Sequence, residues 1–146
     1  MKTVVVYDSA HGNTERIAKS MADAIAGGTQ AVRASTFVAD GLAGLDLLII
    51  GSPTYGGKPT PAMQELLGRL PGPSVKGVKV AAFDTRLGSR FVRVFGFAAD
   101  KISADLAGKG ASVAATPEGF IVKGREGPLK EGELERAAAW ARNLVK

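Results

Sequence analysis

Short apolar runs of strand length alternate along the chain with longer segments in which apolar residues recur at helical spacing. Residues 3–7 form a nearly continuous β-branched run, which is typical of a strand covered on both faces. Residues 14–26 place Ile17, Met21 and Ile25 on one helical stripe that ends at two glycines. The pattern predicts further strands at 31–37, 45–50 and 78–83, a fifth strand broken at Pro117 into 111–115 and 119–122, and further helices at 61–70, 91–107 and 131–145.

This alternation predicts βαβ units and a parallel sheet. Because right-handed crossovers place helices on both faces of such a sheet, we expect an α/β fold: a three-layer sandwich around a five-stranded parallel sheet. The chain has no internal repeat and no linker, so we expect a single domain over residues 1–146. No apolar run has the length of a signal peptide or a membrane span, and we therefore expect a cytoplasmic protein without membrane contact.

In parallel α/β sheets, ligands bind at the carboxyl ends of the strands, where the strand order switches. The loops after the first, third and fourth predicted strands, residues 8–14, 51–61 and 84–90, are therefore the candidate site. Each of the three contains groups that can form hydrogen bonds, and the second also contains an aromatic ring.

The first loop, Ser9-Ala10-His11-Gly12-Asn13-Thr14, contains hydroxyls, an amide and one glycine, and it leads into a helix. Free N–H groups at a helix start and the positive end of the helix dipole favour a phosphate. The loop has no Lys or Arg, so neutral donors would hold the anion. The alternative is an ordinary helix N-cap at Asn13 or Thr14. The loop is neither a Walker A loop nor a dinucleotide fingerprint.

The second loop places Tyr55 among three glycines and three prolines. Glycine lets the backbone approach a ligand closely, and an exposed tyrosine ring can stack on a planar one. The alternative is that Tyr55 packs on its own loop. The third loop offers hydrogen-bonding groups at the same edge, or it is a turn with an N-cap at Ser89.

The amino-acid composition excludes several kinds of functional site. The chain has no cysteine and one histidine, His11, which excludes a thiolate nucleophile, a cysteine-ligated metal centre and a histidine-rich metal site. The net charge is +5, but the basic residues are scattered among acids without aromatic interleaving, so we do not expect nucleic-acid binding. The local group Arg86, Arg90 and Arg93 indicates by itself a solvated helix face.

The three loops together resemble a known family. Residues 7–18 resemble the FMN phosphate loop of flavodoxins, usually Ser/Thr-x-Thr-Gly-x-Thr, and Gly51-Ser52-Pro53-Thr54-Tyr55-Gly56 resembles their second loop. The resemblance covers essentially the whole chain. It implies FMN as the cofactor and the strand order 2-1-3-4-5, for which flavodoxin itself is the type example.

The resemblance also implies a role for each of the three loops in holding FMN. In order, the residues concerned are Ser9, Ala10, His11, Gly12, Asn13 and Thr14 at the phosphate, Pro53, Thr54, Tyr55, Gly56 and Gly57 along the isoalloxazine, and Asp84, Thr85, Arg86, Leu87 and Gly88 at its pyrimidine edge. Tyr55 takes the place of the stacking aromatic, and the pyrimidine edge is met largely by backbone groups. The peptide Gly56-Gly57 matches the one that reorients in the family to accept a hydrogen bond from the reduced flavin.

The sequence departs from the family pattern in three ways. His11 stands where threonine is usual. The fourth-strand loop lacks the tyrosine that often stacks on the second flavin face, so either Leu87 or Phe91 covers that face or it stays open. Flavodoxins are typically acidic, whereas this chain is basic. Arg86, Arg90 and Arg93 therefore favour an acidic partner or a phosphorylated ligand, and we expect a positive charge from Arg86 beside the reduced flavin.

These features favour an FMN electron carrier that shuttles electrons between redox partner proteins, because the flavin supplies the chemistry and the loops contain no catalytic constellation. We expect a monomer without a metal. One alternative is an FMN-dependent NAD(P)H:quinone reductase of the same fold, which would usually carry longer insertions. A second alternative is an interaction module that has lost its flavin.

Overall fold

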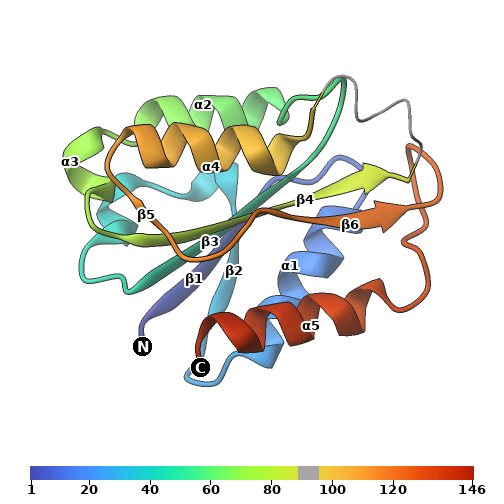
Figure 1. Cartoon of the computed structure of the whole chain (residues 1–146), viewed down its shortest axis with the longest axis horizontal. Helices are drawn as coiled ribbons and strands as arrows, with labels where there is room; N and C mark the ends of the chain where they lie inside the picture. Colours follow the sequence, from blue (N-terminus) through green and yellow to red (C-terminus); the bar gives the residue numbers. More distant parts are fainter. Residues whose placement is uncertain (89–95) are drawn as a thin grey trace.

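The computed structural model describes residues 1–88 and 96–146. Strands and helices alternate along most of this part of the chain (Figure 1). The strands are β1 Thr3–Tyr7, β2 Gln30–Arg33, β3 Leu47–Pro53, β4 Lys79–Leu87, β5 Ser112–Val113 and β6 Glu118–Val122. The helices are α1 Asn13–Ala24, α2 Pro61–Arg69, α3 Gly72–Val75, α4 Ala98–Gly108 and α5 Glu133–Leu144, with 3₁₀ turns η1 Ala34–Thr36 and η2 Ala39–Leu42.

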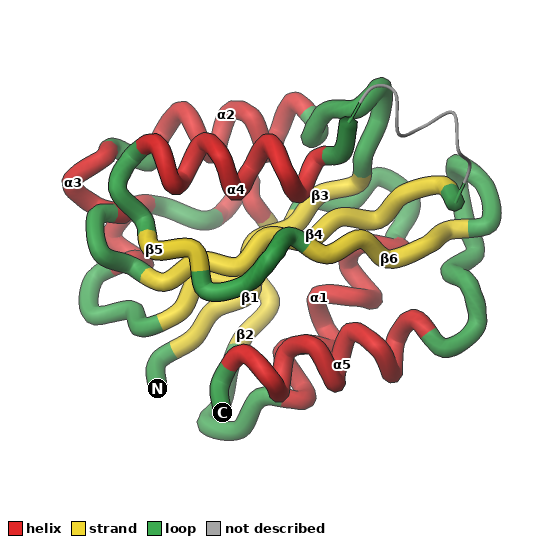
Figure 2. Tube along the Cα trace, viewed as in Figure 1, coloured by secondary structure: helices red, strands yellow, loops and turns green. Residues whose placement is uncertain are grey.

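The strands form one parallel sheet in the order β2-β1-β3-β4-β5, which confirms the predicted topology. The fifth position of the sheet is shared by two segments. Strand β5 pairs with the start of β4, and β6 pairs with its end, so both lie along the same edge of β4 (Figure 2). The predicted interruption near Pro117 is therefore where the edge strand leaves the sheet and returns to it.

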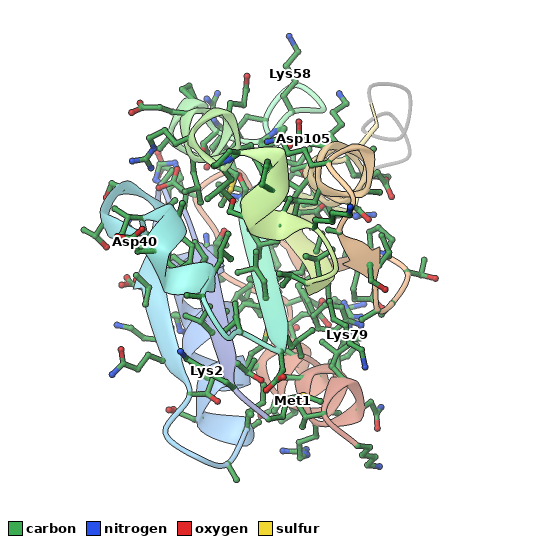
Figure 3. The ribbon with its side chains drawn as sticks, turned by 90° about the vertical axis from the view of Figure 1, so that its left-hand side faces the viewer. Met1, Lys2, Asp40, Lys58, Lys79 and Asp105 are labelled. Carbon is green, nitrogen blue, oxygen red and sulfur yellow. The ribbon has the colours of Figure 1, made fainter. Side chains whose placement is uncertain are left out.

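Helices cover both faces of the sheet. Helices α2, α3 and α4 lie on one face, and α1 and α5 lie on the other (Figure 1). In the view turned by 90° the strands run between these two layers, and Lys58 projects away from the molecule at one end (Figure 3). Each face has its own cluster of buried apolar side chains, so the three-layer sandwich is confirmed.

A group of aromatic rings holds α5 against the carboxyl half of the sheet. Phe83, Phe120 and Trp140 meet edge to face, with ring centroids 6.2 to 6.4 Å apart. Gly51 on β3 makes room for the Phe83 ring, because a Cβ at Gly51 would lie 2.3 Å from a ring carbon. This packing holds β3 and β4 together just before their carboxyl ends, where the candidate loops begin.

Two predicted strand ends are wrong. The second strand ends at Arg33, because the chain turns into η1 where we expected strand up to residue 37. The fourth strand continues to Leu87 because β6 pairs with residues that we expected in a loop. Helix α4 begins at Ala98. Several predictions fall outside the described residues: the helix start at residue 91, the cap at Ser89, and the roles of Arg90, Phe91 and Arg93. No helix in the described chain is long and apolar enough to cross a membrane.

Candidate functional site

A cleft of about 360 Å³ opens at the carboxyl ends of β1, β3 and β4, within the size range of small-molecule sites. The three predicted loops meet there. The predicted residues that line it are Ser9, Ala10, His11, Asn13, Thr14, Pro53, Thr54, Tyr55, Gly56, Gly57, Thr85, Arg86 and Leu87. Gly12, Asp84 and Gly88 were also predicted, but they do not line the cleft, whereas Val122 and Arg125 do and were not predicted.

The first loop delivers the start of α1 to the cleft. Gly12 is the N-cap, in the left-handed conformation at φ 90°, and its N–H donates to the Ser9 hydroxyl at 3.0 Å. No side chain caps the helix, so the alternative of an N-cap at Asn13 or Thr14 is wrong. The N–H groups of the first helical turn have no acceptor within the helix and remain for a ligand. The loop thus ends in an uncapped helix start, a feature that favours anions in general.

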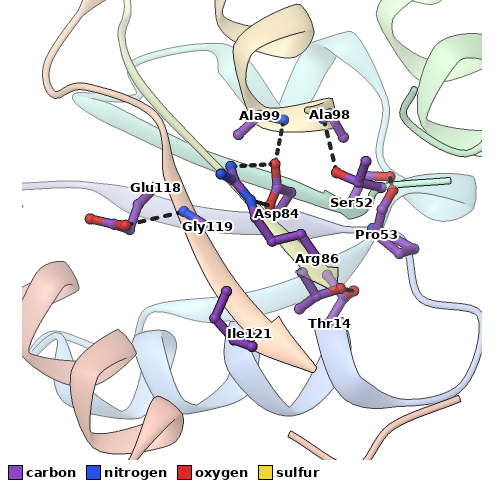
Figure 4. Close-up of polar contacts among 12 residues, drawn as sticks. Thr14, Ser52, Pro53, Asp84, Arg86, Ala98, Ala99, Glu118, Gly119 and Ile121 are labelled. Carbon is purple, nitrogen blue, oxygen red and sulfur yellow. Dashed lines mark hydrogen bonds and ion pairs between the residues drawn. The ribbon is translucent and has the colours of Figure 1, made fainter. Parts of the chain in front are cut away.

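Two hydroxyl groups form the floor of the cleft between α1 and β4. The Thr14 and Thr85 oxygens lie 2.8 Å apart, and both side chains are buried (Figure 4). A hydroxyl donates one hydrogen bond, so this pair uses one O–H and leaves the other for a ligand. The floor is therefore a neutral hydrogen-bond donor.

Tyr55 stands at the base of a tight hairpin in the second loop. The backbones of Tyr55 and Lys58 exchange hydrogen bonds of 3.0 and 3.1 Å, and Gly56 and Gly57 between them have φ values of 58° and 78°. A two-residue turn with positive φ at both positions is type I′, which side chains other than glycine, asparagine and aspartate disfavour. The two glycines thus fix the hairpin that places Tyr55 on the cleft wall.

The second loop is also tied down on both sides of the hairpin. The Ser52 hydroxyl donates to the Pro53 carbonyl and accepts from the Thr60 N–H, at 2.9 and 3.0 Å. The Thr60 hydroxyl caps α2 and donates to Asp8 on the first loop at 2.5 Å. These contacts link the first two loops, so the cleft walls on this side are held together by hydrogen bonds.

Asp84 and Arg86 form a buried ion pair at the end of β4. The Arg86 guanidinium donates to both Asp84 oxygens at 2.7 and 2.9 Å, and the Ala99 N–H donates to the same carboxylate at 2.9 Å (Figure 4). The guanidinium also stacks on Phe97, 3.5 Å from the ring centroid, and lies over Gly119. Burial raises the pKa of Asp84, and the bonds from Arg86 oppose that rise.

This geometry locates Asp84 and corrects the expectation for Arg86. The Asp84 side chain is fully buried against α4 and does not line the cleft, and the contact predicted there, largely through backbone groups, stays a prediction. Arg86 does line the cleft, but Asp84 neutralises its charge, and it lies on a strand rather than on the solvated helix face that we expected. The free positive charge expected at Arg86 is therefore absent.

The loop after β6 forms a further wall that the sequence analysis missed. The Arg125 guanidinium lies 5.1 Å from the centroid of the Tyr55 ring. Gly127 packs against Asn13, because a Cβ at Gly127 would lie 2.7 Å from the Asn13 amide oxygen. The rule that ligands gather at strand ends applied to the fifth strand as well, and that rule was the available signal for this loop.

The comparisons with known proteins agree with this architecture. The profile of the flavodoxin family matches residues 5–140. The chain belongs to the flavodoxin family. Members of this family bind FMN and carry electrons. No curated protein matches the sequence of this chain.

Solved structures of flavodoxins share the fold over almost the whole chain. A flavodoxin from the domain Archaea is 21% identical with a TM-score of 0.82, and the match covers 99% of this chain and 96% of that one. Oxidised flavodoxin 1 from Bacillus cereus is 19% identical with a TM-score of 0.80, over 99% and 97% of the two chains. A flavodiiron protein from Giardia intestinalis is 24% identical with a TM-score of 0.76, over 98% of this chain and 35% of that one.

The cleft of this flavodoxin-family protein fits the three parts of FMN. The uncapped start of α1 and the Thr14 hydroxyl suit a phosphate, the Thr85 hydroxyl suits a polar chain, and Tyr55 offers a face to a planar ring. Most of the exposed lining is apolar, as a site for an aromatic ring requires.

Proposed function

We propose that this protein is an electron carrier that holds FMN in the cleft and shuttles electrons between redox partner proteins. The observation that carries the proposal is the convergence of the uncapped α1 start and the Tyr55 hairpin on one cleft. When bound, FMN supplies the redox chemistry. The chain supplies binding, orientation and charge.

In this proposal the first loop binds the phosphate. The N–H groups at the start of α1 donate to its oxygens, and Ser9, Asn13 and Thr14 add side-chain donors. The Ser9 hydroxyl already accepts from Gly12, which leaves its own O–H to donate. The loop has no Lys or Arg, so the phosphate is held by directed hydrogen bonds and the helix dipole.

The end of β4 meets the pyrimidine edge of the ring through its backbone. Strand β3 pairs with β4 as far as Thr85, whereas β6 pairs with it as far as Leu87. The side of β4 that faces β3 is therefore unpaired by β3 at residues 86–87, next to the cleft. The backbone groups on that side can form hydrogen bonds with the donors and acceptors of a flavin edge, which would take the place of β3.

The surface charge favours partners of opposite sign. The chain carries a net charge of +5, and Lys58 and Arg125 are exposed at the two loops that border the cleft. An acidic protein surface would approach this rim with favourable electrostatics, which acts mainly on the association rate. We propose acidic redox partners, a monomeric carrier and a cytoplasmic location.

The test is an absorption and fluorescence titration of the purified protein with FMN. We expect binding with quenched flavin fluorescence, and we expect NADH and NADPH to reduce the bound flavin only through an added reductase. Direct oxidation of either nucleotide with a quinone present would indicate the quinone reductase instead. Failure to bind FMN would contradict the proposed function and favour the flavin-free module.

Thr14 separates phosphate recognition from ring recognition. Thr14→Ala should weaken FMN by roughly 1.5 to 3 kcal/mol, the range for losing a hydrogen bond to a charged group. Riboflavin, which lacks the phosphate, should bind the variant and the parent equally. Thr14→Ser keeps the hydroxyl and is the matched control; equal FMN affinity in Thr14→Ala would move the phosphate elsewhere.

A further inference from the structure

The segment between β6 and α5 is a closed loop that presents Arg125 at the cleft. The Lys123 N–H donates to the Pro128 carbonyl at 2.9 Å, and the Gly127 N–H donates to the Gly124 carbonyl at 3.0 Å. The Lys123 ammonium also pairs with Glu131. These contacts hold the two ends of the loop together, and Arg125 lies between them.

This loop reaches both halves of the site. Arg125 lies over the Tyr55 ring of the β3–α2 hairpin, and Gly127 packs on Asn13 at the start of α1. Two residues of chain therefore span the distance from the ring-binding wall to the phosphate loop. A ligand that occupies the cleft lies within reach of Arg125, which lines the cleft with Tyr55.

Arg125 also has the charge that Arg86 lacks. Arg86 is bound by both oxygens of Asp84, whereas Arg125 forms no ion pair with any carboxylate among residues 1–88 and 96–146. Arg125 is exposed, and its ring contact with Tyr55 is a cation–π interaction. Its charge is thus available to a group bound beside Tyr55.

We propose that Arg125 contacts the isoalloxazine of bound FMN and stabilises its reduced form, a role that rests on the proposed FMN site. Full reduction adds two electrons from the redox partner and one proton from solvent, which leaves the ring with one more negative charge. A guanidinium beside the ring binds that anion more tightly than the neutral oxidised ring. Arg125 is therefore the residue that makes the flavin easier to reduce.

The test compares three variants by flavin affinity and by redox titration. Arg125→Gln removes the charge, Arg125→Lys keeps it without the planar guanidinium, and Lys130→Gln removes a charge from the same exposed segment away from the cleft. In Arg125→Gln we expect the affinity for reduced FMN to fall about fivefold more than that for oxidised FMN, which makes the midpoint potential more negative. Arg125→Lys should recover most of the shift, and Lys130→Gln should resemble the parent.

A comparison of FMN with riboflavin shows which part of the ligand Arg125 contacts. If Arg125 acts on the ring, Arg125→Gln changes the affinities for FMN and riboflavin by the same factor, and the change shrinks at high salt. A loss confined to FMN would place Arg125 at the phosphate and overturn the proposal. A potential that does not move, in a protein that binds FMN normally, would overturn the role of Arg125 alone; a parent protein that does not bind FMN would instead overturn the proposed function.

Discussion

Arg86 and Arg125 both line the cleft, but the structure holds them in opposite ways. Arg86 lies on strand β4 between Asp84 and Phe97 and is mostly buried. Arg125 lies on a loop, is exposed, and contacts the Tyr55 ring. Residue type alone predicts the same chemistry for both. The comparison shows that a cation enclosed and paired by the fold is withheld from a ligand, whereas an unpaired cation at a cleft is available to one.

The different positions follow from the strands that precede them. Asp84 and Arg86 are two residues apart on β4, so their side chains lie on the same face of the sheet and can pair. Gly119 on the neighbouring β6 has no side chain, and the guanidinium occupies that space. Arg125 follows the end of β6, beyond the last paired residue. Sheet pairing therefore explains which arginine is enclosed.

The largest expected effect comes from breaking the buried pair. Arg86→Gln leaves the Asp84 carboxylate buried without a charged partner, with the Ala99 N–H and the Thr54 hydroxyl still donating to it, and we expect a loss of about 3 kcal/mol of unfolding free energy. Urea unfolding measures it. The double variant Asp84→Asn with Arg86→Gln has no buried charge and should recover part of the loss. Single and double variants of equal stability would contradict a cost from the unpaired charge of Asp84.

A smaller loss of unfolding free energy should follow when the Asp84–Arg86 pair is disturbed by a change at the neighbouring Gly119. A Cβ at Gly119 would lie 2.1 Å from Nε of Arg86, so Gly119→Ala must displace a guanidinium that Asp84 and Phe97 hold. We expect a cost of about 1 to 3 kcal/mol from overpacking. The control is Gly68→Ala, the same change inside α2 where no atom lies within 4 Å, and alanine should stabilise that helix. A Gly119→Ala protein as stable as the parent would mean that Arg86 relaxes freely.

How far the sequence predicts these features depends on how local their causes are. The run at 3–7 predicts β1 because a strand covered on both faces is apolar at nearly every position. The end of β4 was missed because Asp84 and Arg86 look like loop residues until β6, more than 30 positions away, pairs beside them. Tyr55 stood out as an aromatic residue in a glycine-rich loop, whereas nothing local distinguishes Arg125 from other surface arginines. Contacts between distant segments therefore account for most of what was missed.

A change at Tyr55 tests the surroundings of Arg125, because Tyr55 carries the ring that Arg125 contacts. Tyr55→Ala should weaken FMN by roughly 1 to 3 kcal/mol, by analogy with stacking of bases on aromatic residues, and should restore part of the flavin fluorescence. Tyr55→Phe keeps the ring and should bind nearly as well as the parent. If Tyr55→Ala quenches and binds FMN as the parent does, another residue stacks on the flavin. The contact with Tyr55 would then no longer place Arg125 beside the flavin ring.

The smallest expected effect is a change in titration without a change in stability. Burial raises the pKa of the Tyr55 phenol, and the positive charge of Arg125 lowers it, because a nearby cation favours the phenolate. Removing that charge in Arg125→Gln should therefore raise the pKa of Tyr55 further in the flavin-free protein. Ultraviolet titration of the phenols measures this shift, and a Tyr55→Phe background identifies the signal, since Tyr7 is the other tyrosine. The unfolding free energy of Arg125→Gln should stay within about 0.5 kcal/mol of the parent, as for other surface changes. An unchanged pKa of Tyr55 would show that the charge of Arg125 does not act on the phenol. A large loss of unfolding free energy would show that Arg125 has a structural role like that of Arg86.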